Sequence, residues 1–434
     1  MKIRYYLILL IFGFLSCEKQ WDDPIPEGAI LGTPNLTANL TEEGKVMLNW
    51  DFSRFCPGWM CIDWVEGSRY EIFGKYPGTN DFIRISRLGA DEKAFLVENL
   101  EFGKPYEFYL TTHRAGQKTT SNRVMIIPNP FPEFQTLMES DDWDPIFNPK
   151  INPNGDKIAY ISNYRWSEGD QNFMTLSLYL LDLFSGQTEL IKLNSHHPQW
   201  SADGKKIVFG TDDGLSQIAQ GYKPTRLEIF DINSKESTVI SSGQYQQYFP
   251  SFERGNAAVI FLSDSLERGN MGLWRTETNG TTKVLWPSFQ LPEQGVGLPL
   301  FTGMDGSVFK DIVAVDNIRV VENRPIYNIY GLEYGSGIQK KDLVISQWND
   351  MAPAFSTFDE RLLSFISDRS GSRQIWTLDI TNGKLNQISY FKNDENFVSS
   401  STSLSWTDQG KAIVFSIYSV GGIQKVVKIS VPDF

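Results

Sequence analysis

The sequence predicts an all-β protein in which a small antiparallel sandwich precedes a larger six-bladed β-propeller. Two observations carry this prediction. In the first part of the chain, short runs with apolar side chains at every second position alternate with Gly and Asn turns. From about residue 130, a large apolar residue recurs six times at intervals of 49 to 54 residues. The 434 residues, 41% hydrophobic and 21% charged, suffice for two or three folded domains.

Residues 1–16 form a predicted secretory signal. Lys2 and Arg4 precede an apolar run over residues 5–15, which is too short to span a bilayer permanently. Ser16-Cys17 resembles the lipobox of bacterial lipoproteins, and this resemblance implies cleavage after Ser16 and lipidation of Cys17. The alternative is an ordinary secreted protein with an unmodified cysteine. Two or more acyl chains would anchor the mature chain stably to a membrane that it does not cross.

Residues 17–32 form the predicted lipidated tether. Glu18 stands where an Asp would resemble a signal for inner-membrane retention, so the outer membrane is favoured. The acidic stretch 18–23 resembles the export signals of lipoproteins that reach the outer face of some bacteria with two membranes. We therefore expect a lipid-anchored protein of the bacterial outer membrane that faces the cell exterior, with the periplasmic face as the alternative. The excess of 52 acidic over 40 basic side chains argues against nucleic acid as a partner.

Residues 33–128 form the predicted sandwich. Apolar side chains alternate over residues 46–50, 70–75 and 106–110, as in half-buried antiparallel strands. Trp50 and the stretch around Tyr106 resemble the core tryptophan and the tyrosine corner of fibronectin type III domains. The resemblance implies that fold, and another type of antiparallel sandwich is the alternative.

The connection over residues 51–69 departs from that family. Cys56 and Cys61 are separated by four residues that include a Pro-Gly turn, and an exported chain matures in an oxidising compartment, so we expect a disulfide. A zinc site would need two further ligands nearby, which the sequence lacks. The disulfide would hold three side chains of types that often anchor protein interfaces: Trp59, Met60 and Trp64. The alternative is that these side chains fold back over an open end of the sandwich.

Residues 129–434 contain six repeats. Their apolar anchors are Ile151, Trp200, Phe252, Phe301, Phe355 and Trp406, and a proline stands two positions before each of the first five. A turn and several short β runs follow most anchors. Four strands per unit of about fifty residues indicate a propeller blade, because a single blade cannot bury both faces of its sheet.

Two stretches, 200–209 and 367–376, resemble the TolB-like propeller family most specifically. The resemblance extends from about residue 133 to the end, although the fourth unit is degenerate, and it implies a closed six-bladed ring. The last unit has only about three strands before the chain ends. We therefore expect residues 133–140 to supply its missing outer strand, since closure removes the exposed edges of an open array.

The expected binding surface is the face of the propeller that carries its long loops. Long connections are predicted at residues 163–172, 212–226, 263–272 and 316–325, whereas the turns on the other face are short. Loops on a rigid scaffold often carry function, and the alternative is that these loops are merely variable and solvated. The candidate partner-binding residues lie on this face and in the connection over residues 51–69. They are Trp59, Met60, Trp64, Tyr164, Arg165, Trp166, His196, His197, Tyr222, Tyr248, Trp348 and Arg369.

Catalysis has little support in the sequence. No Gly-x-Ser-x-Gly motif occurs, and the predicted anchor and disulfide use all three cysteines. Some propellers resembling this class are polysaccharide lyases with histidine-rich metal sites. Here His196 and His197 are adjacent, so on a strand they would point to opposite faces, and the third histidine, His113, lies in the sandwich. We expect no catalytic residue, no metal and no cofactor.

The sequence therefore favours a non-catalytic binding or scaffold protein that docks to an outer-membrane or cell-surface protein complex. One alternative is a glycan- or nutrient-binding lipoprotein that stacks ligands on Trp166, Tyr222 and Trp348. Another is a metal-dependent polysaccharide lyase or hydrolase of the propeller type.

Overall fold

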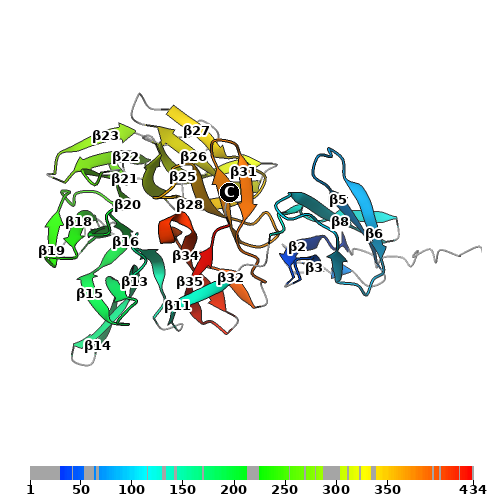
Figure 1. The fold of residues 1–434 in the computed structure, drawn as a ribbon, viewed down its shortest axis with the longest axis horizontal. Coiled ribbons are helices and arrows are strands. Elements are labelled where there is room, and N and C mark those ends of the chain that lie inside the picture. The colour runs from blue at the N-terminus through cyan, green and yellow to red at the C-terminus, as the bar shows by residue number, and fades with distance from the viewer. Residues whose placement is uncertain are drawn as a thin grey trace, which may run out of the picture. The chain divides into compact units, whose positions relative to one another are not determined.

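The computed structural model describes an all-β chain (Figure 1). The described residues are 30–41, 43–52, 63–64, 68–114, 116–129, 133–140, 144–168, 171–212, 224–253, 255–267, 270–278, 280–286, 304–309, 312–321, 324–333, 339–392, 395–399, 402–419 and 421–432. The one helical element among them is a 3₁₀ turn at Asp408–Gly410. The residues singled out in the sequence that lie outside the described residues include Cys17, Cys56, Trp59, Met60, Cys61, Tyr222 and the fourth repeat anchor, Phe301.

The chain divides into two compact units. Of the described residues, those in 30–36, 49–95 and 107–123 belong to the smaller unit. The larger unit contains residues 124–434 together with 37–48 and 96–106.

Antiparallel sheets dominate the part of the chain that precedes residue 128. One sheet contains β5 (Arg69–Lys75), β6 (Ile83–Leu88), β8 (Tyr106–Arg114), β9 (Gln117–Thr120) and β10 (Val124–Ile126). A second contains β2 (Pro34–Leu40), β3 (Val46–Phe52) and β7 (Ala94–Val97). The short strands β1 (Ile30–Leu31) and β4 (Asp63–Trp64) pair in parallel, so the end of the predicted tether joins the loop that follows Trp50.

Two contacts in this region follow from the alternating pattern. On β3, Val46, Leu48 and Trp50 are buried, and the Trp50 ring packs edge-on against Tyr70, with 5.4 Å between ring centroids. The Tyr106 hydroxyl accepts a hydrogen bond from the Glu101 N–H at 2.9 Å. This is the upstream backbone contact that a tyrosine corner makes.

Among the described residues from 133 onward, the strands form six antiparallel sheets. The first contains β12 (Phe147–Ile151), β13 (Lys157–Glu168), β14 (Gln171–Asp182) and β15 (Thr188–Leu193). The second contains β16 (Ser195–Trp200), β17 (Lys206–Thr211), β18 (Arg226–Asp231) and β19 (Glu236–Val239). The third contains β20 (Gln247–Phe252), β21 (Ala258–Glu267), β22 (Asn270–Glu277) and β23 (Thr282–Trp286). The fourth and fifth contain β24 (Met304–Phe309), β25 (Ile312–Val321), β26 (Arg324–Glu333) and β27 (Gln339–Val344), then β28 (Asp350–Phe355), β29 (Leu362–Ser367), β30 (Gln374–Asp379) and β31 (Lys384–Gln387). The sixth contains β11 (Phe134–Ser140), β35 (Gln424–Ser430), β34 (Ala412–Ser419), β32 (Asn396–Val398) and β33 (Ser405–Thr407).

These six sheets surround a common centre, as Figure 1 shows, and we refer to them as the sheet ring. Their first strands contact one another in a closed cycle from β12 through β16, β20, β24, β28 and β33 back to β12. The five described anchor residues of the repeats are between 1% and 7% exposed. The Trp200 indole N–H donates to the Lys150 carbonyl at 2.8 Å, and that of Trp406 donates to the Ala354 carbonyl at 3.0 Å. The described anchors therefore fill the core, and the two tryptophan anchors also join the first strands of neighbouring sheets.

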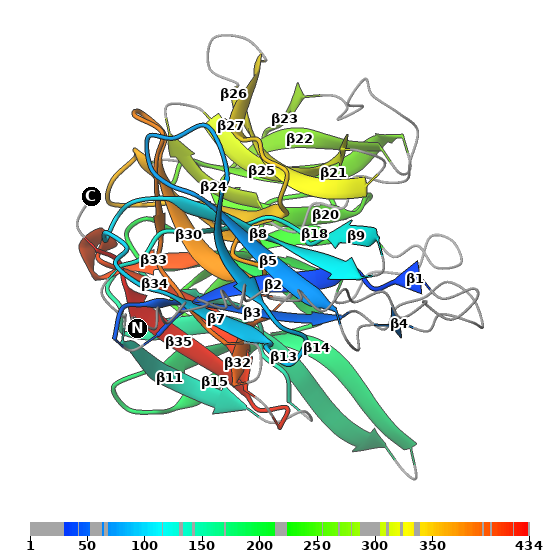
Figure 2. The same ribbon diagram turned by 90° about the vertical axis from the view of Figure 1, so that its right-hand side faces the viewer.

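The ring closes through the strand that was predicted to close it. β11 pairs antiparallel with β35, from Phe134 opposite Ile429 to Ser140 opposite Gln424, and the two strands lie side by side in Figure 2. The Gln424 side chain adds a second link, because its Oε1 accepts from the Ile146 N–H at 2.7 Å and its Nε2 donates to the Ile146 carbonyl. Ile146 immediately precedes β12, so this amide joins the sixth sheet to the first.

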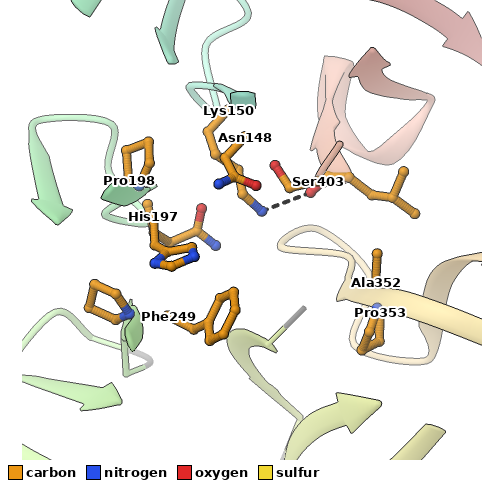
Figure 3. Close-up of a pocket in the computed structure, with 11 residues that line it drawn as sticks. Asn148, Lys150, His197, Pro198, Phe249, Ala352, Pro353 and Ser403 are labelled. Carbon is orange, nitrogen blue, oxygen red and sulfur yellow. Dashed lines mark hydrogen bonds between the residues drawn. The ribbon is translucent and has the colours of Figure 1, made fainter. Parts of the chain in front are cut away.

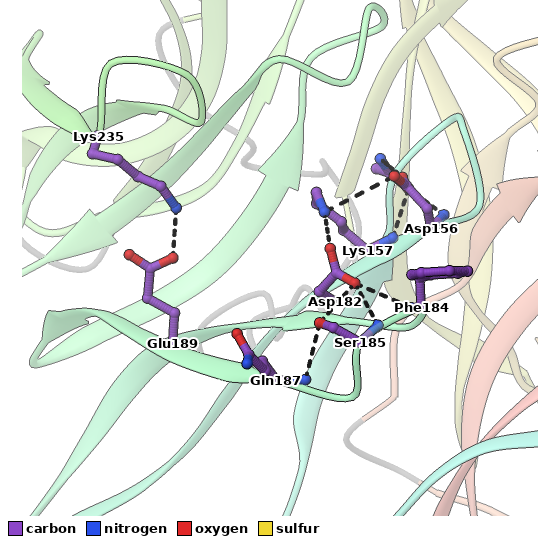
Figure 4. A network of polar contacts seen from close by, with 9 residues as sticks. Asp156, Lys157, Asp182, Phe184, Ser185, Gln187, Glu189 and Lys235 are labelled. Atoms are coloured by element: carbon purple, nitrogen blue, oxygen red, sulfur yellow. Dashed lines mark hydrogen bonds and ion pairs between the residues drawn. The ribbon is translucent and has the colours of Figure 1, made fainter.

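An aspartate at the end of the third strand caps the following turn in several sheets. In the first sheet, Asp182 accepts from the N–H groups of Phe184 and Ser185 and pairs with Lys157 (Figure 4). The Lys157 ammonium, followed by hydrogen bonds from Ser185, lowers the pKa of the Asp182 carboxyl. Asp231 and Asp379 cap equivalent turns, which explains the recurring aspartate in the sequence.

Candidate functional site

A pocket lies at the centre of the sheet ring, where first strands converge (Figure 3). It is lined by Asn148, Lys150, His197, Pro198, Gln199, Phe249, Pro250, Ala352, Pro353, Ser403 and Leu404. Of these residues, only Lys150 carries a permanent charge, and its Nζ donates to the Leu404 carbonyl at 2.9 Å. The pocket therefore offers amide, imidazole and aromatic groups around one ammonium group.

Four lining residues share an unusual backbone conformation. Asn148, His197, Phe249 and Ala352 have φ angles of 47°, 50°, 51° and 51°, and each immediately precedes a proline. At each of them the register between the first and second strand shifts. Positive φ is uncommon outside glycine and stores strain, which tends to persist at functional sites. We call these four residues the channel collar.

His197, a residue of the channel collar, contacts the neighbouring His196. Their Nδ1 atoms lie 2.9 Å apart, so one imidazole donates its Nδ1–H to the unprotonated Nδ1 of the other. Tyr248 lies 5.9 Å from both rings, and Phe249 lies 4.1 Å from the His197 ring, measured between centroids. The bulge at the collar brings the two histidines together, although adjacent residues on a regular strand point to opposite faces.

Burial keeps both imidazoles neutral. It lowers the pKa of His196 to about 4, against the opposing effect of the Asp212 carboxylate. The pKa of His197 is lowered well below its usual value by burial and then by the neighbouring His196. The pair therefore acts as a neutral hydrogen-bonding unit at pH 7.

A glycine on the next strand makes room for His196. Gly210 lies opposite His196 in the pairing of β16 with β17. A Cβ atom at Gly210 would lie 2.1 Å from the His196 Cε1 atom, which is closer than real carbon atoms approach. Nothing in the sequence singled out this glycine, because its role depends on the pairing register.

A second hollow lies at the short-turn end of the same first strands. The anchors Trp200, Phe252 and Phe355 line it together with turn residues that include Asp359 and Arg361. The sequence favoured the long-loop face for binding, and the structure shows that the opposite end of the channel is concave as well.

On the long-loop side, the expected loop 163–172 is a paired hairpin. β13 and β14 pair in unbroken register from Lys157 opposite Asp182 to Glu168 opposite Gln171. Figure 2 shows this hairpin extending beyond the neighbouring strands. The connections at 263–272 and 316–325 are likewise occupied mostly by strands. Over residues 163–166 polar and aromatic side chains alternate, which suits strand pairing as well as a loop.

The hairpin tip carries an aromatic cluster on one face. Tyr164 stacks near Trp166 with 5.9 Å between ring centroids, and Trp166 stacks on Phe173 at 5.3 Å. Trp166 is 39% exposed, and on the other face Met174 is 62% exposed. Leu176 is 43% exposed. The predicted candidate Arg165 also lies here and pairs with Asp144 at 2.6 Å.

Arg369 does not fit its predicted place on a binding surface. It is 2% exposed, and its Nη2 lies 2.5 Å from Oδ1 of the buried Asp350. Its guanidinium also lies within 5.4 Å of three aromatic ring centroids, those of Trp348, Phe365 and Trp376. The charged residue is buried because an ion pair and aromatic faces compensate it, a combination that the local sequence does not reveal.

The remaining predicted residues are scattered. Trp348 is half-buried beside Arg369 rather than at the hairpin. Trp64 lies in β4, and its side chain is not among those described. Tyr222 lies outside the described residues.

Within the described part of the chain, no group of three or more His, Cys, Asp or Glu side chains is arranged to hold a metal ion. No helix there has the length and apolar character that crossing a membrane requires.

No protein-family model and no curated protein matches the chain. Solved structures that it resembles include TolB from Acinetobacter baumannii, at 16% identity over 85% of this chain and 65% of that chain, with a TM-score of 0.30. They also include the tricorn protease, at 19% identity over 66% of this chain and 26% of that chain (TM-score 0.42). An oligogalacturonate lyase in complex with manganese matches at 11% identity over 70% and 98% of the two chains (TM-score 0.42). At these scores the likenesses carry no functional argument.

Proposed function

We propose that this protein is a lipid-anchored, non-catalytic binding protein of the bacterial outer membrane that faces the cell exterior and docks to an envelope protein complex. In this proposal, residues 33–128 are a fibronectin type III-like sandwich that serves as a spacer. Residues 129–434 are a TolB-like six-bladed propeller that serves as the interaction platform. Cys17 is the anchor, and the loop over residues 51–69, with its disulfide between Cys56 and Cys61, is a second docking element.

The observation that carries the proposal is the β13–β14 hairpin. Its tip exposes apolar side chains on both of its faces, with Trp166 on one and Met174 and Leu176 on the other. Large apolar side chains that gather on an exposed element favour a protein interface, in which tryptophan is a frequent hot spot. The lack of a nucleophile motif in the sequence supports binding rather than catalysis.

Photo-crosslinking in intact cells tests the proposal. A photoreactive phenylalanine analogue at Met174 is expected to crosslink to an envelope protein. The matched control is the same analogue at Phe184, which is 98% exposed and lies two residues beyond the other end of β14. The unanchored Cys17→Ser variant is expected to leave the membrane fraction and lose the crosslink. No crosslink at Met174, or equal capture at Phe184, would refute docking through the hairpin.

A substitution then measures the strength of the contact. Trp166→Ala is expected to weaken partner recovery by about 30-fold, as for a hot spot worth about 2 kcal/mol. Because Trp166 lies at the hairpin tip and stacks on Tyr164 and Phe173 there, the same substitution should lower the free energy of unfolding by about 1 kcal/mol or less.

A further inference from the structure

We propose that a groove between the second and third sheets binds a neutral, hydroxyl-rich ligand, namely an oligosaccharide. The groove lies between the end of β19 and the β20–β23 sheet, and it is separate from the hairpin and from the channel collar. The proposal therefore does not depend on the docking function, and each can fail alone.

Two polar groups in the groove lack partners. Ser263 is 1% exposed, and neither its hydroxyl nor the buried indole Nε1 of Trp274 has a hydrogen-bond partner within the described structure. Ser263 and Phe261 share one face of β21, and Trp274 lies opposite Phe261 on β22, so both groups belong to the same side of the third sheet. A buried polar group without a partner destabilises the fold, and ligand oxygen atoms would supply the missing contacts.

The charge of the groove selects the class of ligand. Eleven residues line it and none is charged, although 21% of the chain is charged and its net charge is −12. A phosphate or a uronate would find no counter-charge there, so an anionic ligand would lose its hydration without compensation. The ligand that fits is therefore neutral.

Aromatic and polar side chains alternate along the lining. Tyr245 is 38% exposed and Trp274 is half-buried, so each offers part of a ring to a ligand. The hydroxyl of Ser241 and the amide of Gln247 lie in the same lining and contact each other. The aromatic rings can pack on the apolar faces of sugars, and the hydroxyl and amide groups can hydrogen-bond to sugar hydroxyls. In such a lining, a few polar groups orient the ligand.

Calorimetry on the full chain tests the proposal. The probes are maltoheptaose, cellohexaose, xylohexaose and mannohexaose, with a galacturonate hexamer as the acidic probe and a neutral apolar decapeptide as the peptide probe. At least one neutral oligosaccharide is expected to bind more tightly than the acidic and peptide probes. Binding of none of the four, or tighter binding of the peptide or of the galacturonate, would overturn the proposal.

Conservative variants locate the site. Trp274→Phe keeps a ring but removes the N–H, and Ser263→Ala removes only the hydroxyl. Each is expected to weaken sugar binding by about 2- to 10-fold, the value of one hydrogen bond. Without ligand, each variant should be as stable as the parent or more so, because an unpaired group has been removed. The control Trp166→Ala, at the hairpin, should bind the sugar normally. If both groove variants bind sugar like the parent, the groove is not the site.

Discussion

At the scale of single residues, the site depends on a few atoms that the backbone register brings together. The sequence singled out His196, His197 and Tyr248, and the structure places their rings within 6 Å of one another. Phe249 was missed, although it precedes Pro250 as His197 precedes Pro198, and that recurrence was the available signal. Gly210 was missed because only the pairing of β16 with β17 shows that His196 lies against it.

Substitution of this glycine should displace the histidine. We expect Gly210→Ala to lower the free energy of unfolding by about 1–3 kcal/mol, because the added methyl group overlaps the His196 ring. Urea denaturation measures the change. When Gly210→Ala is added to the variant His196→Ala, it should lower the free energy of unfolding much less than it does in the parent, because the ring that the new methyl group would overlap is absent. Additive losses in the double variant would contradict the assigned contact.

The histidine pair also predicts a pH dependence of stability. The pKa of His196 falls to about 4 in the folded chain and that of His197 is lowered too, whereas an unfolded histidine titrates near 6.5. As the pH falls, the histidines of the unfolded chain therefore become protonated before those of the folded chain. The stability that the neutral histidines contribute is complete above about pH 6.5 and is lost as the pH falls toward 4.

The measurement compares the parent with the double variant His196→Gln/His197→Gln, because carboxylates titrate in the same range in both. The difference in free energy of unfolding, parent minus variant, should decrease by a few kcal/mol, on the order of 1.4 kcal/mol per pKa unit, between pH 7 and pH 4. A difference that stays constant over this range would show that the pair does not titrate as inferred.

At the scale of the element, period-two patterns were reliable guides to strands but poor guides to where strands end. Residues 163–172 were interpreted as the connection between the second and third strands of the first repeat, yet the pairing of β13 with β14 continues to Glu168 opposite Gln171. Where a hairpin extends beyond its sheet, no buried face imposes a hydrophobic pattern on the sequence. The length of the hairpin is then defined only by the pairing of its two strands. The hairpin holds its aromatic cluster more rigidly than a loop would, which favours recognition with little loss of conformational entropy.

The same limit applies to buried polar residues. Arg369 follows Ser367-Asp368 in a stretch that is typical of an exposed turn, and its burial depends on Asp350, 19 positions away. Local sequence carries no record of such a partner. The anchors, by contrast, were predictable because every repeat places the same kind of side chain at the same distance along the chain.

At the scale of the whole molecule, the predicted pairing of the first and last strands of the ring is present in the structure. It was predictable because the last unit is short of one strand and a free edge is unfavourable. The Gln424 clamp on Ile146 was not predictable, since a lone glutamine gives no signal before the ends of the ring are brought together.

This clamp predicts how the ring opens. Gln424 is 1% exposed, and Gln424→Ala leaves the buried N–H and carbonyl of Ile146 unpaired. We expect the free energy of unfolding to fall by about 1–3 kcal/mol. Hydrogen exchange should become faster in β11, β35 and β12, because the loss lies where the two ends of the ring meet.

A matched control separates closure from hydrogen bonding in general. Gln374 makes the same pair of contacts with the N–H and carbonyl of Phe391, but it lies within the chain, between the fifth and sixth sheets. Gln374→Ala also removes contacts with Ser372 and Ser389, so it should destabilise at least as much. Exchange in β11 should stay close to that of the parent beyond Phe134, the residue that packs on Phe391. If both variants accelerate exchange in β11 equally, the ring unfolds as one cooperative unit. The pairing of β11 with β35 is then no less stable than the contacts between other neighbouring sheets. If only Gln424→Ala does so, the pairing of β11 with β35 is the place where the ring first opens.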